Sequence, residues 1–570
     1  MREIITIQVG GFANFIGSHF WNFQDELLGL AADSNNDPVF KNHFLNMDVL
    51  YRTGETPEGI STYTPRVVSI DYQGSLGSVC SHGTLYNQIS PVPSPVFTWR
   101  GRLSTHRSEP HKKNLFLRCL DEEEHGASND IDHEHTESQK ELRDEDVIQC
   151  LENGVQFWTD FSKVHYHPQS LYELSGLWMD AQGFDNYGIG KDVFSEGLRG
   201  EAMSDRLRFF VEECDNIQGI QFVVDDSGGF SSVAADFLEN IADDYSSTPV
   251  LLYAVRSPSS YMNSTTRKRT ISRDLHDSIS FSRLSSFCKL LVPVGLPLLS
   301  KSKASTYLCL DDQKPYHCSA VYAAALHSLS LPFRMELHGP TANLSCVSGS
   351  SDINSIIQML SGQSRQNMVA ILDAAMPAPC LIGSLAEQPL LSNLQPLTPE
   401  VAEEEDLQSL ESLVIHGVLQ SGGHQASVSE VEETISAAYG NAMPMPRFSH
   451  LSVALCPLPI PLPFPSIFNY AIGKRGELLG TPALDLPSKG SLDVSSIPMA
   501  VRLRNSSAVL PFLLNRLESL RSYGIRQGAP GADLLRSWGF GKDELEDIGE
   551  VLSNMVAALD PGSNLTSDSD

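Results

Sequence analysis

The chain has 570 residues, of which 41% are hydrophobic and 19% are charged. This composition excludes a fully disordered chain, a collagen and a coiled coil, and the length predicts two large domains or three to four smaller ones. With 40 basic and 70 acidic residues, the formal net charge is -30, which makes nucleic acid a poor partner. The densest basic cluster, Arg267-Lys268-Arg269, is interpreted as a solvated loop.

Cysteine usage and hydropathy predict a cytosolic chain. The ten cysteines are scattered without a CxxC pair, which is typical of reduced thiols. The start of the sequence lacks the apolar region of a signal peptide and the composition of a transit peptide. The longest uncharged stretch, 451–473, contains five prolines that each remove a backbone donor, so we expect no spanning helix there. Any membrane association is expected to be peripheral.

Strand-like runs alternate with helical patterns through the first 255 residues. Strands are predicted at 4–9, 67–70, 217–224 and 250–255, and helices at 21–30 and 232–245. This alternation predicts an α/β fold with a doubly wound, mostly parallel sheet. Ligands of such sheets bind beyond the carboxyl ends of the strands.

Two segments interrupt the regular patterns. Residues 121–146 hold twelve acids against two bases and are predicted to form a disordered insertion that is dispensable for folding. The three histidines within it, His125, His133 and His135, are interpreted as solvated side chains rather than metal ligands. Residues 392–423, with two prolines and an acidic run, are predicted to be a surface loop.

The carboxyl end predicts two packed helices, at 506–523 and 543–559, separated by glycine and proline residues at 524–531. The predicted domains are therefore three. Residues 1–264 form the doubly wound domain with a disordered acidic insertion near 89–164. Residues 265–490 form an intermediate α/β domain with a loop near 392–423, and residues 491–570 form a helical region with a short acidic tail.

Two glycine turns are candidates for binding phosphate. Val9-Gly10-Gly11 follows the first predicted strand and opens a helix, and Ser227-Gly228-Gly229 does the same after a later strand. Backbone N–H groups and the positive end of a helix attract anions at such turns. Glycine after a strand is also common for turn geometry alone, and this alternative stays open.

The residues around these turns resemble tubulin in a collinear series that covers most of the chain, apart from 89–164 and about 340–490. The matching positions include Arg2 to Trp21, Tyr63 to Arg66, Asp71, Gly83-Thr84, His167-Pro168, Ile189 to Lys191, Gln218-Gly219, Ser227 to Gly229, Asn505 to Ala508 and Arg516-Leu517. A tubulin-like frame with altered loops and an early insertion is similar to the Misato family. That resemblance implies a tubulin-like fold, with a second α/β domain and carboxyl-terminal helices.

The resemblance also implies which residues belong to a phosphate site and how that site has changed. Phe230 takes the place of a small threonine, and Asp225 and Asp226 precede the turn, either repelling phosphate or capping the next helix. Gln73 replaces a second acid near the metal-bound phosphates. We interpret the following residues as vestigial phosphate loops: Gly10, Gly11, Asn14, Asp71, Ser227, Gly228 and Gly229.

The hydrolytic residues of tubulin have no counterpart at the expected positions. Counting back from Pro332-Phe333-Arg334 places Ala320, Tyr322 and Ala325 where tubulin has Asn, Asp and Glu, and none of the three can orient water. No other catalytic residue and no metal site is predicted, and Cys318 beside His317 is interpreted as a buried structural thiol. We therefore expect no enzyme activity and no required cofactor, while GTP binding without hydrolysis stays open.

The Misato resemblance implies a role in mitochondrial distribution, morphology and network formation or fusion. It implies a location in the cytoplasm and at the cytosolic face of the mitochondrial outer membrane. Expected partners are proteins of that membrane or of the cytoskeleton, and we expect the carboxyl-terminal helices to bind them. The alternatives are a GTP-binding, self-assembling GTPase and an assembly factor for tubulin or the spindle.

Overall fold

The computed structural model describes most of the chain. Its described residues are 2–33, 37–41, 44–56, 59, 61–79, 111–126, 137–179, 183–262, 266–336, 346–361, 368–381, 389–403, 406, 408–441, 446–482 and 486–559. The predicted acidic tail lies outside these ranges. Within them, no helix combines the length and the apolar composition needed to cross a bilayer.

The first sheet is parallel and has six strands. Their order is β5 (Leu171–Trp178), β4 (Val67–Gln73), β1 (Glu3–Val9), β6 (Ile217–Asp225), β7 (Val250–Val255) and β8 (Leu290–Val294). Every residue of β1 and β7 is buried, because helices cover both faces of the sheet. The four strands predicted in the first 255 residues correspond to β1, β4, β6 and β7, so the predicted doubly wound sheet is confirmed.

The second sheet is mixed and also has six strands. Their order is β11 (Gln395–Pro396), β10 (Ile371–Ala375), β16 (Met499–Asn505), β12 (Leu410–His416), β13 (Phe448–Ala454) and β9 (Val347–Ser348). Strand β16 is antiparallel to both neighbours, whereas β12 and β13 are parallel. Two small antiparallel pairs, β2 (Tyr51–Glu55) with β3 (Ser61–Pro65) and β14 (Leu458–Pro459) with β15 (Ser496–Ile497), are the remaining strands among the described residues.

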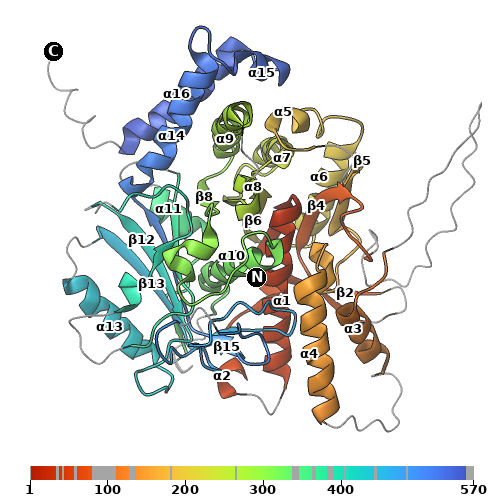
Figure 1. Cartoon of the computed structure of the whole chain (residues 1–570), viewed down its shortest axis with the longest axis vertical. Helices are drawn as coiled ribbons and strands as arrows, with labels where there is room; N and C mark the ends of the chain where they lie inside the picture. The colour runs from red at the N-terminus through yellow and green to blue at the C-terminus, as the bar shows by residue number, and fades with distance from the viewer. Residues whose placement is uncertain are drawn as a thin grey trace, which may run out of the picture.

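Two helices join the sheets. Helix α1 (Gly11–Ala32) lies against the first sheet, and α10 (Pro315–Ser330) packs on α1 and contacts β12 and β16 of the second sheet (Figure 1). All residues of α10 after Pro315 are buried. One hydrophobic cluster therefore contains residues of both sheets, including Ile4, Val223, Leu372 and Val501.

The outer face of the first sheet is covered by a second helical layer. Its helices are α6 (Arg199–Glu212), α7 (Phe230–Asp244), α9 (Arg267–Ser285), α14 (Leu510–Leu520) and α16 (Lys542–Leu559). Arg267, Lys268 and Arg269 begin α9, so the loop predicted there is wrong. Helices α14 and α16 confirm the two helices predicted at the carboxyl end, and a π-helical turn at 521–525 and α15 (Ala532–Ser537) lie between them. Helices α11 (Ile353–Ser361) and α13 (Val428–Asn441) pack with the second sheet. The shorter helices are α2 (Pro38–Lys41), α5 (Tyr187–Gly190), α8 (Pro258–Met262) and α12 (Pro389–Ser392).

The predicted disorder of 121–146 is wrong for the described part of that segment. Residues 121–126 belong to α3 (Leu115–Gly126) and residues 137–146 to α4 (Glu137–Gly154), while 127–136 lie outside the described residues. The apolar side chains that anchor these helices mostly flank the acidic stretch. Phe116, Val147 and Leu151 pack against Phe161 and Tyr316. Burial of this apolar side keeps the acid-rich helices folded.

The predicted loop at 392–423 is also wrong in its second half. Residues 410–416 form β12, a central strand of the second sheet in which every residue is buried. The short strand β11 at 395–396 lies at the edge of the same sheet. Prolines and acids at 396–406 dominate the composition of this stretch and obscure the apolar run that follows.

Candidate functional site

The structure brings the seven predicted site residues together. Strand β1 lies between β4 and β6, so the residues that follow or end these three strands meet at one edge of the sheet. Gly10 and Gly11 follow β1, Asp71 lies near the end of β4, and Ser227-Gly228-Gly229 follows β6. Asn14, in the first turn of α1, donates a hydrogen bond from Nδ2 to Asp71 Oδ2 over 3.1 Å. The seven residues therefore lie together at the carboxyl ends of β1, β4 and β6.

Asp225 links the two glycine turns. Its Oδ2 accepts the backbone N–H of Phe12, in the first turn of α1, over 3.3 Å. Its Oδ1 accepts the backbone N–H of Ser227 over 3.1 Å and the Ser227 hydroxyl over 2.6 Å. Burial raises the pKa of this carboxyl above its usual value. The Asp225 carboxylate thus accepts hydrogen bonds from backbone N–H groups at both turns. A phosphate oxygen bound at these turns would need the same donors.

This arrangement corrects the capping interpretation of the two acids. Helix α7 begins after Gly229 and has no side-chain hydrogen bond at its cap, so neither Asp225 nor Asp226 caps it. Asp225 instead accepts the backbone N–H of Phe12 at the start of α1. Asp226 pairs with Arg256 over 2.8 Å between Oδ1 and Nε.

Aromatic side chains fill the space beside Gly10. A Cβ atom on this glycine, which has a φ of 98°, would lie 2.8 Å from Asp225 Cβ and 3.1 Å from the Phe230 ring. The Phe230 ring packs on Tyr72 and Phe184, with centroid distances of 4.6 and 5.1 Å. No phosphate can lie between Gly10 and these side chains without moving them.

The Ser227-Gly228-Gly229 turn is covered by the segment that enters α5. The carbonyl of Phe184 accepts the N–H of Gly229 over 3.0 Å. A Cβ atom on Gly228 would clash with that carbonyl oxygen, and one on Gly190 would clash with the carbonyl oxygen of Gly229. These glycines are needed for close contact between two segments of the chain, which is a different reason from the turn geometry considered above.

Asp71 is buried, and both of its carboxylate oxygens accept hydrogen bonds from other residues of the chain. Its Oδ1 accepts the N–H of Tyr72 over 2.8 Å, and its Oδ2 accepts Asn14. Burial raises its pKa to about 7, and the nearby Asp225 charge acts in the same direction. Gln73 lies at the sheet edge and accepts the N–H of Gly176 over 3.1 Å. Since Mg²⁺ needs several anionic or water oxygens with open geometry, these residues do not fit a GTP–magnesium complex.

A buried ion cluster lies next to the turn, and sequence reasoning missed it. Arg256 follows β7 and pairs with Asp226 and also with Asp277 of α9, over 2.8 Å in both cases. Burial alone raises the pKa of Asp277, but the Arg256 guanidinium outweighs it and lowers that pKa to about 2. His276 Nε2 contacts the Asp226 carbonyl oxygen over 2.7 Å. The sequence does contain a signal for this pair, because Asp226 directly follows β6 and Arg256 directly follows β7, and the two strands are parallel neighbours.

The three positions expected for the hydrolytic residues lie inside a helix. Ala320, Tyr322 and Ala325 belong to α10 and are fully buried. The Tyr322 hydroxyl accepts the N–H of Leu296 over 3.0 Å. These three positions therefore carry no information about hydrolysis. Cys318 lies in the same helix and is fully buried, as expected of a structural thiol.

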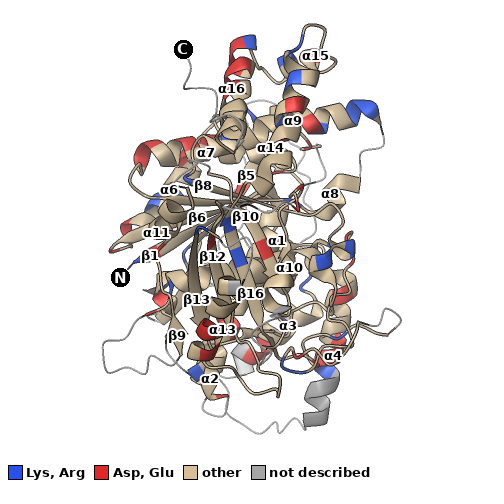
Figure 2. Cartoon of the chain, turned by 90° about the vertical axis from the view of Figure 1, so that its left-hand side faces the viewer, with Lys and Arg blue, Asp and Glu red and all other residues tan. Residues whose placement is uncertain are grey.

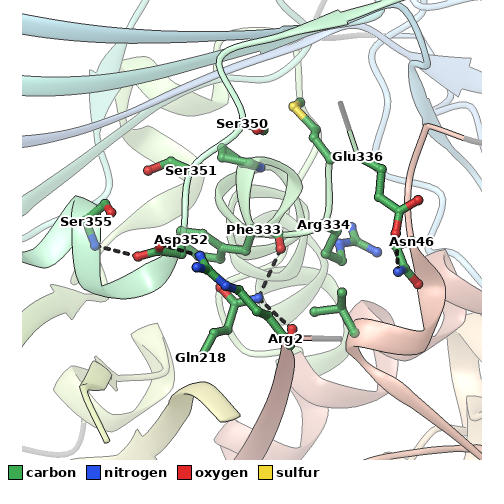
Figure 3. Close-up of a pocket in the computed structure, with 13 residues that line it drawn as sticks. Arg2, Asn46, Gln218, Phe333, Arg334, Glu336, Ser350, Ser351, Asp352 and Ser355 are labelled. Carbon is green, nitrogen blue, oxygen red and sulfur yellow. Dashed lines mark hydrogen bonds and ion pairs between the residues drawn. The ribbon is translucent and has the colours of Figure 1, made fainter. Parts of the chain in front are cut away.

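A pocket of about 640 Å³ lies at the opposite end of β1 and β6, where their amino ends meet the loop before α11 (Figure 3). Two carboxylates line this pocket, those of Asp352 and Glu336, and both interact with other residues of the chain. Asp352 pairs with Arg2 over 2.8 Å and accepts the N–H of Ser355 over 2.7 Å, and Glu336 Oε1 accepts Asn46 Nδ2 over 2.5 Å. None of the predicted site residues lines this pocket.

Comparisons with known proteins agree with this architecture. A family model described as the Misato Segment II tubulin-like domain matches residues 2–122, and one described as a tubulin domain matches residues 148–335. The chain is 29% identical to proteins named Protein misato homolog 1 from Mus musculus and Homo sapiens, over 99% of both chains in each case. It is also 29% identical to Protein DML1 from Gibberella zeae over 59% of this chain and 61% of that protein.

Proposed function

Because the chain belongs to the Misato family of tubulin-related proteins, we propose that it is a non-catalytic, tubulin-like protein that works through binding surfaces. One observation carries this proposal: the Asp225 carboxylate accepts hydrogen bonds from the first turn of α1 and from the turn after β6. A group of the chain itself thereby satisfies donors that a nucleotide phosphate would otherwise engage.

We propose further that the protein maintains the distribution, morphology and fusion of the mitochondrial network. Its place is the cytoplasm and the cytosolic face of the mitochondrial outer membrane, where it associates peripherally through proteins of that membrane or of the cytoskeleton. The family resemblance supports this part of the proposal.

The partner-binding surface is proposed to include α16. Its buried side includes Leu545, Ile548 and Leu552, while Asp543, Asp547 and Glu550 are exposed on the other side. These three acids follow one another at helical spacing and so form one outward face. A partner with basic residues fits this face.

Depletion and rescue in cells test the proposal. We expect depletion to change the shape of the mitochondrial network, and the wild-type chain and Asp71→Asn to restore it. The triple variant Asp543→Lys, Asp547→Lys, Glu550→Lys should fold but restore it poorly. An unchanged network after depletion would refute the mitochondrial role.

Proximity labelling separates the remaining rivals. Enrichment of mitochondrial outer-membrane proteins is the expected result. Enrichment of tubulin and chaperonin in their place would favour an assembly factor. Magnesium-dependent GTP binding with turnover would favour a self-assembling GTPase.

A further inference from the structure

A buried arginine lines the pocket at the amino ends of β1 and β6. Arg334 follows the 3₁₀ turn Leu331–Phe333 and is only 1% exposed, and Figure 3 shows its side chain beside Asn46 on the wall of the pocket. Its Nη1 donates to Gln24 Oε1 over 2.6 Å and lies 3.7 Å from the sulfur of Met47. Its Nε and Nη2 are buried and have no acceptor among the described residues.

Nε and Nη2 together form one edge of the guanidinium group. The N–H groups of this edge are parallel and match the two oxygens of a carboxylate. The protein uses the same edge elsewhere. Arg52 donates from Nε and Nη2 to the two oxygens of Glu213 over 2.5 and 2.6 Å, and Arg504 donates in this way to Asp373 over 2.7 and 3.4 Å. The corresponding edge of Arg334 is therefore built to receive a carboxylate.

The charge of Arg334 has no counterion within the part of the chain that the structure describes. By contrast, the buried Arg256 pairs with Asp226 and Asp277. Burial lowers the pKa of Arg334 to about 10, so its guanidinium is still charged at neutral pH. Residues 337–345, which follow in the sequence and lie outside the described residues, include no acid. A buried cation without a partner is unfavourable for the chain alone.

We propose that the pocket binds a small organic acid, whose carboxylate is held by Nε and Nη2 of Arg334. The pocket volume of about 640 Å³ is within the usual range for small-molecule sites. The rest of its wall includes apolar side chains and hydroxyl groups that suit the body of such a ligand, namely Val49, Pro332, Phe333, Ser350 and Ser351. This site lies at the opposite end of β1 and β6 from the glycine turns, so it does not depend on the proposed function.

The charges around the pocket favour a ligand with a single negative charge. Arg2 and Arg334 are balanced by Asp352 and Glu336, so the wall has no net charge. One carboxylate would neutralise the unpaired guanidinium of Arg334. A doubly charged phosphate would add a second charge near two carboxylates, which oppose it.

The two donors of Arg334 are shielded from solvent, so binding requires a nearby side chain to move. Met47 contacts the guanidinium, and Met335 lines the pocket. Methionine side chains are unbranched and flexible, so these two can rearrange while the backbone stays in place.

Ligand-observed NMR with the full chain tests this assignment. The probes are benzoate and hexanoate, each compared with its uncharged primary amide, and phenyl phosphate. At least one carboxylate should bind saturably and about tenfold or more tightly than its amide, because the amide has one acceptor and no charge. Benzoate should also bind more tightly than phenyl phosphate. Tighter binding of phenyl phosphate would overturn the assignment to a carboxylate. Equal binding of acids and amides, or no saturable binding of either, would overturn the site.

Two variants separate the donors of Arg334 from the general charge of the pocket. Arg334→Lys keeps the charge but removes the parallel donors, and it should weaken binding of the carboxylate about tenfold or more. The matched control, Arg2→Gln with Asp352→Asn, removes the ion pair of the same pocket without changing its net charge and should change affinity less than about threefold. Equal loss in both variants would overturn the role of Arg334. If Arg334→Lys does not fold, the comparison of acid and amide on the wild-type chain decides.

Discussion

At the residue scale, the main feature of the site is a pair of carboxylates that accept hydrogen bonds from other residues of the chain. Asp225 accepts hydrogen bonds from Phe12 and Ser227, and Asp71 accepts them from Asn14 and Tyr72. Both groups are buried deeply enough that their pKa values are raised. Two nearby acids in such a place favour their neutral forms and oppose an incoming triphosphate.

Asp71 should make the stability of the protein depend on pH. Its pKa is about 7 in the folded chain against 3.8 for the free side chain, so the folded state binds this proton more tightly. The free energy of unfolding therefore falls as the pH rises from about 4 to about 7, by up to about 1.4 kcal/mol per pH unit. Asp71→Asn should remove this contribution, as measured by chemical denaturation across the range.

The substitution Asp71→Asn should be tolerated, because the new amide can donate to Asn14 Oδ1, which has no partner among the described residues. The difference in unfolding free energy between the two proteins should favour the variant increasingly as the pH rises. A constant difference between about pH 4 and about pH 7 would show that Asp71 keeps an ordinary pKa. Asp205→Asn, an exposed acid on α6, serves as the control and should leave the profile unchanged.

At the element scale, one glutamate links α4 to two other segments of the chain. Glu152 Oε2 pairs with His317 Nε2 of α10 over 2.8 Å, and its Oε1 accepts the N–H of Ser466 over 2.6 Å. Burial opposes the charge of this group, but the bond to His317 and the other donors outweigh burial and lower its pKa to about 2. Three segments far apart in the sequence thus meet at a single carboxylate.

Glu152→Ala should destabilise the protein, since a hydrogen bond to a charged group contributes about 1.5–3 kcal/mol. Because the folded pKa is depressed, the contribution of Glu152 is fully present above about pH 4.5 and declines toward pH 2. Thermal unfolding with Glu145→Ala, an exposed acid on the same helix, as the control measures this effect. A variant as stable as the control would mean that α4 is only loosely attached.

Elements with strong apolar patterns could be predicted from the sequence. Elements whose apolar positions are outnumbered by acidic residues could not. Strand β7 is a continuous apolar run, and β1 and β6 are rich in apolar residues, as expected of strands in a sheet covered on both faces. Helix α4 was missed because its acids outnumber the apolar positions that Val147 and Leu151 provide. The seven site residues were predicted from glycine turns after strands and from the resemblance to tubulin. The contact of Phe184 with Gly229 joins segments distant in the sequence, and no local pattern indicates it.

At the scale of the whole molecule, α1 and α10 make the two sheets one unit. Gln24 of α1 accepts Arg334 Nη1 over 2.6 Å, and its Nε2 contacts His327 Nδ1 of α10 over 2.8 Å. The next residue, Ser328, contacts His416 of β12 over 2.9 Å between Oγ and Nε2. All of these side chains are buried, so a continuous polar network accompanies the shared hydrophobic core.

The protein should therefore unfold in a single transition. Gln24→Leu leaves the buried Arg334 without this acceptor and should lower the stability of both sheets together, by about 1.5–3 kcal/mol. Gln24→Glu keeps an acceptor for Arg334 and should lose less. Hydrogen exchange checks this by comparing the amides of β1 and β12, whose protection should fall in parallel. Loss of protection in one sheet alone would show that the sheets are independent.

The central claim is that contacts within the chain have replaced nucleotide at the glycine turns. Equilibrium binding of labelled GTP to the purified full-length protein, with and without Mg²⁺ and followed by phosphate release, tests it most directly. The expected result is no saturable binding at micromolar GTP and phosphate release no faster than in buffer. Tight, magnesium-dependent binding with sustained turnover would contradict it.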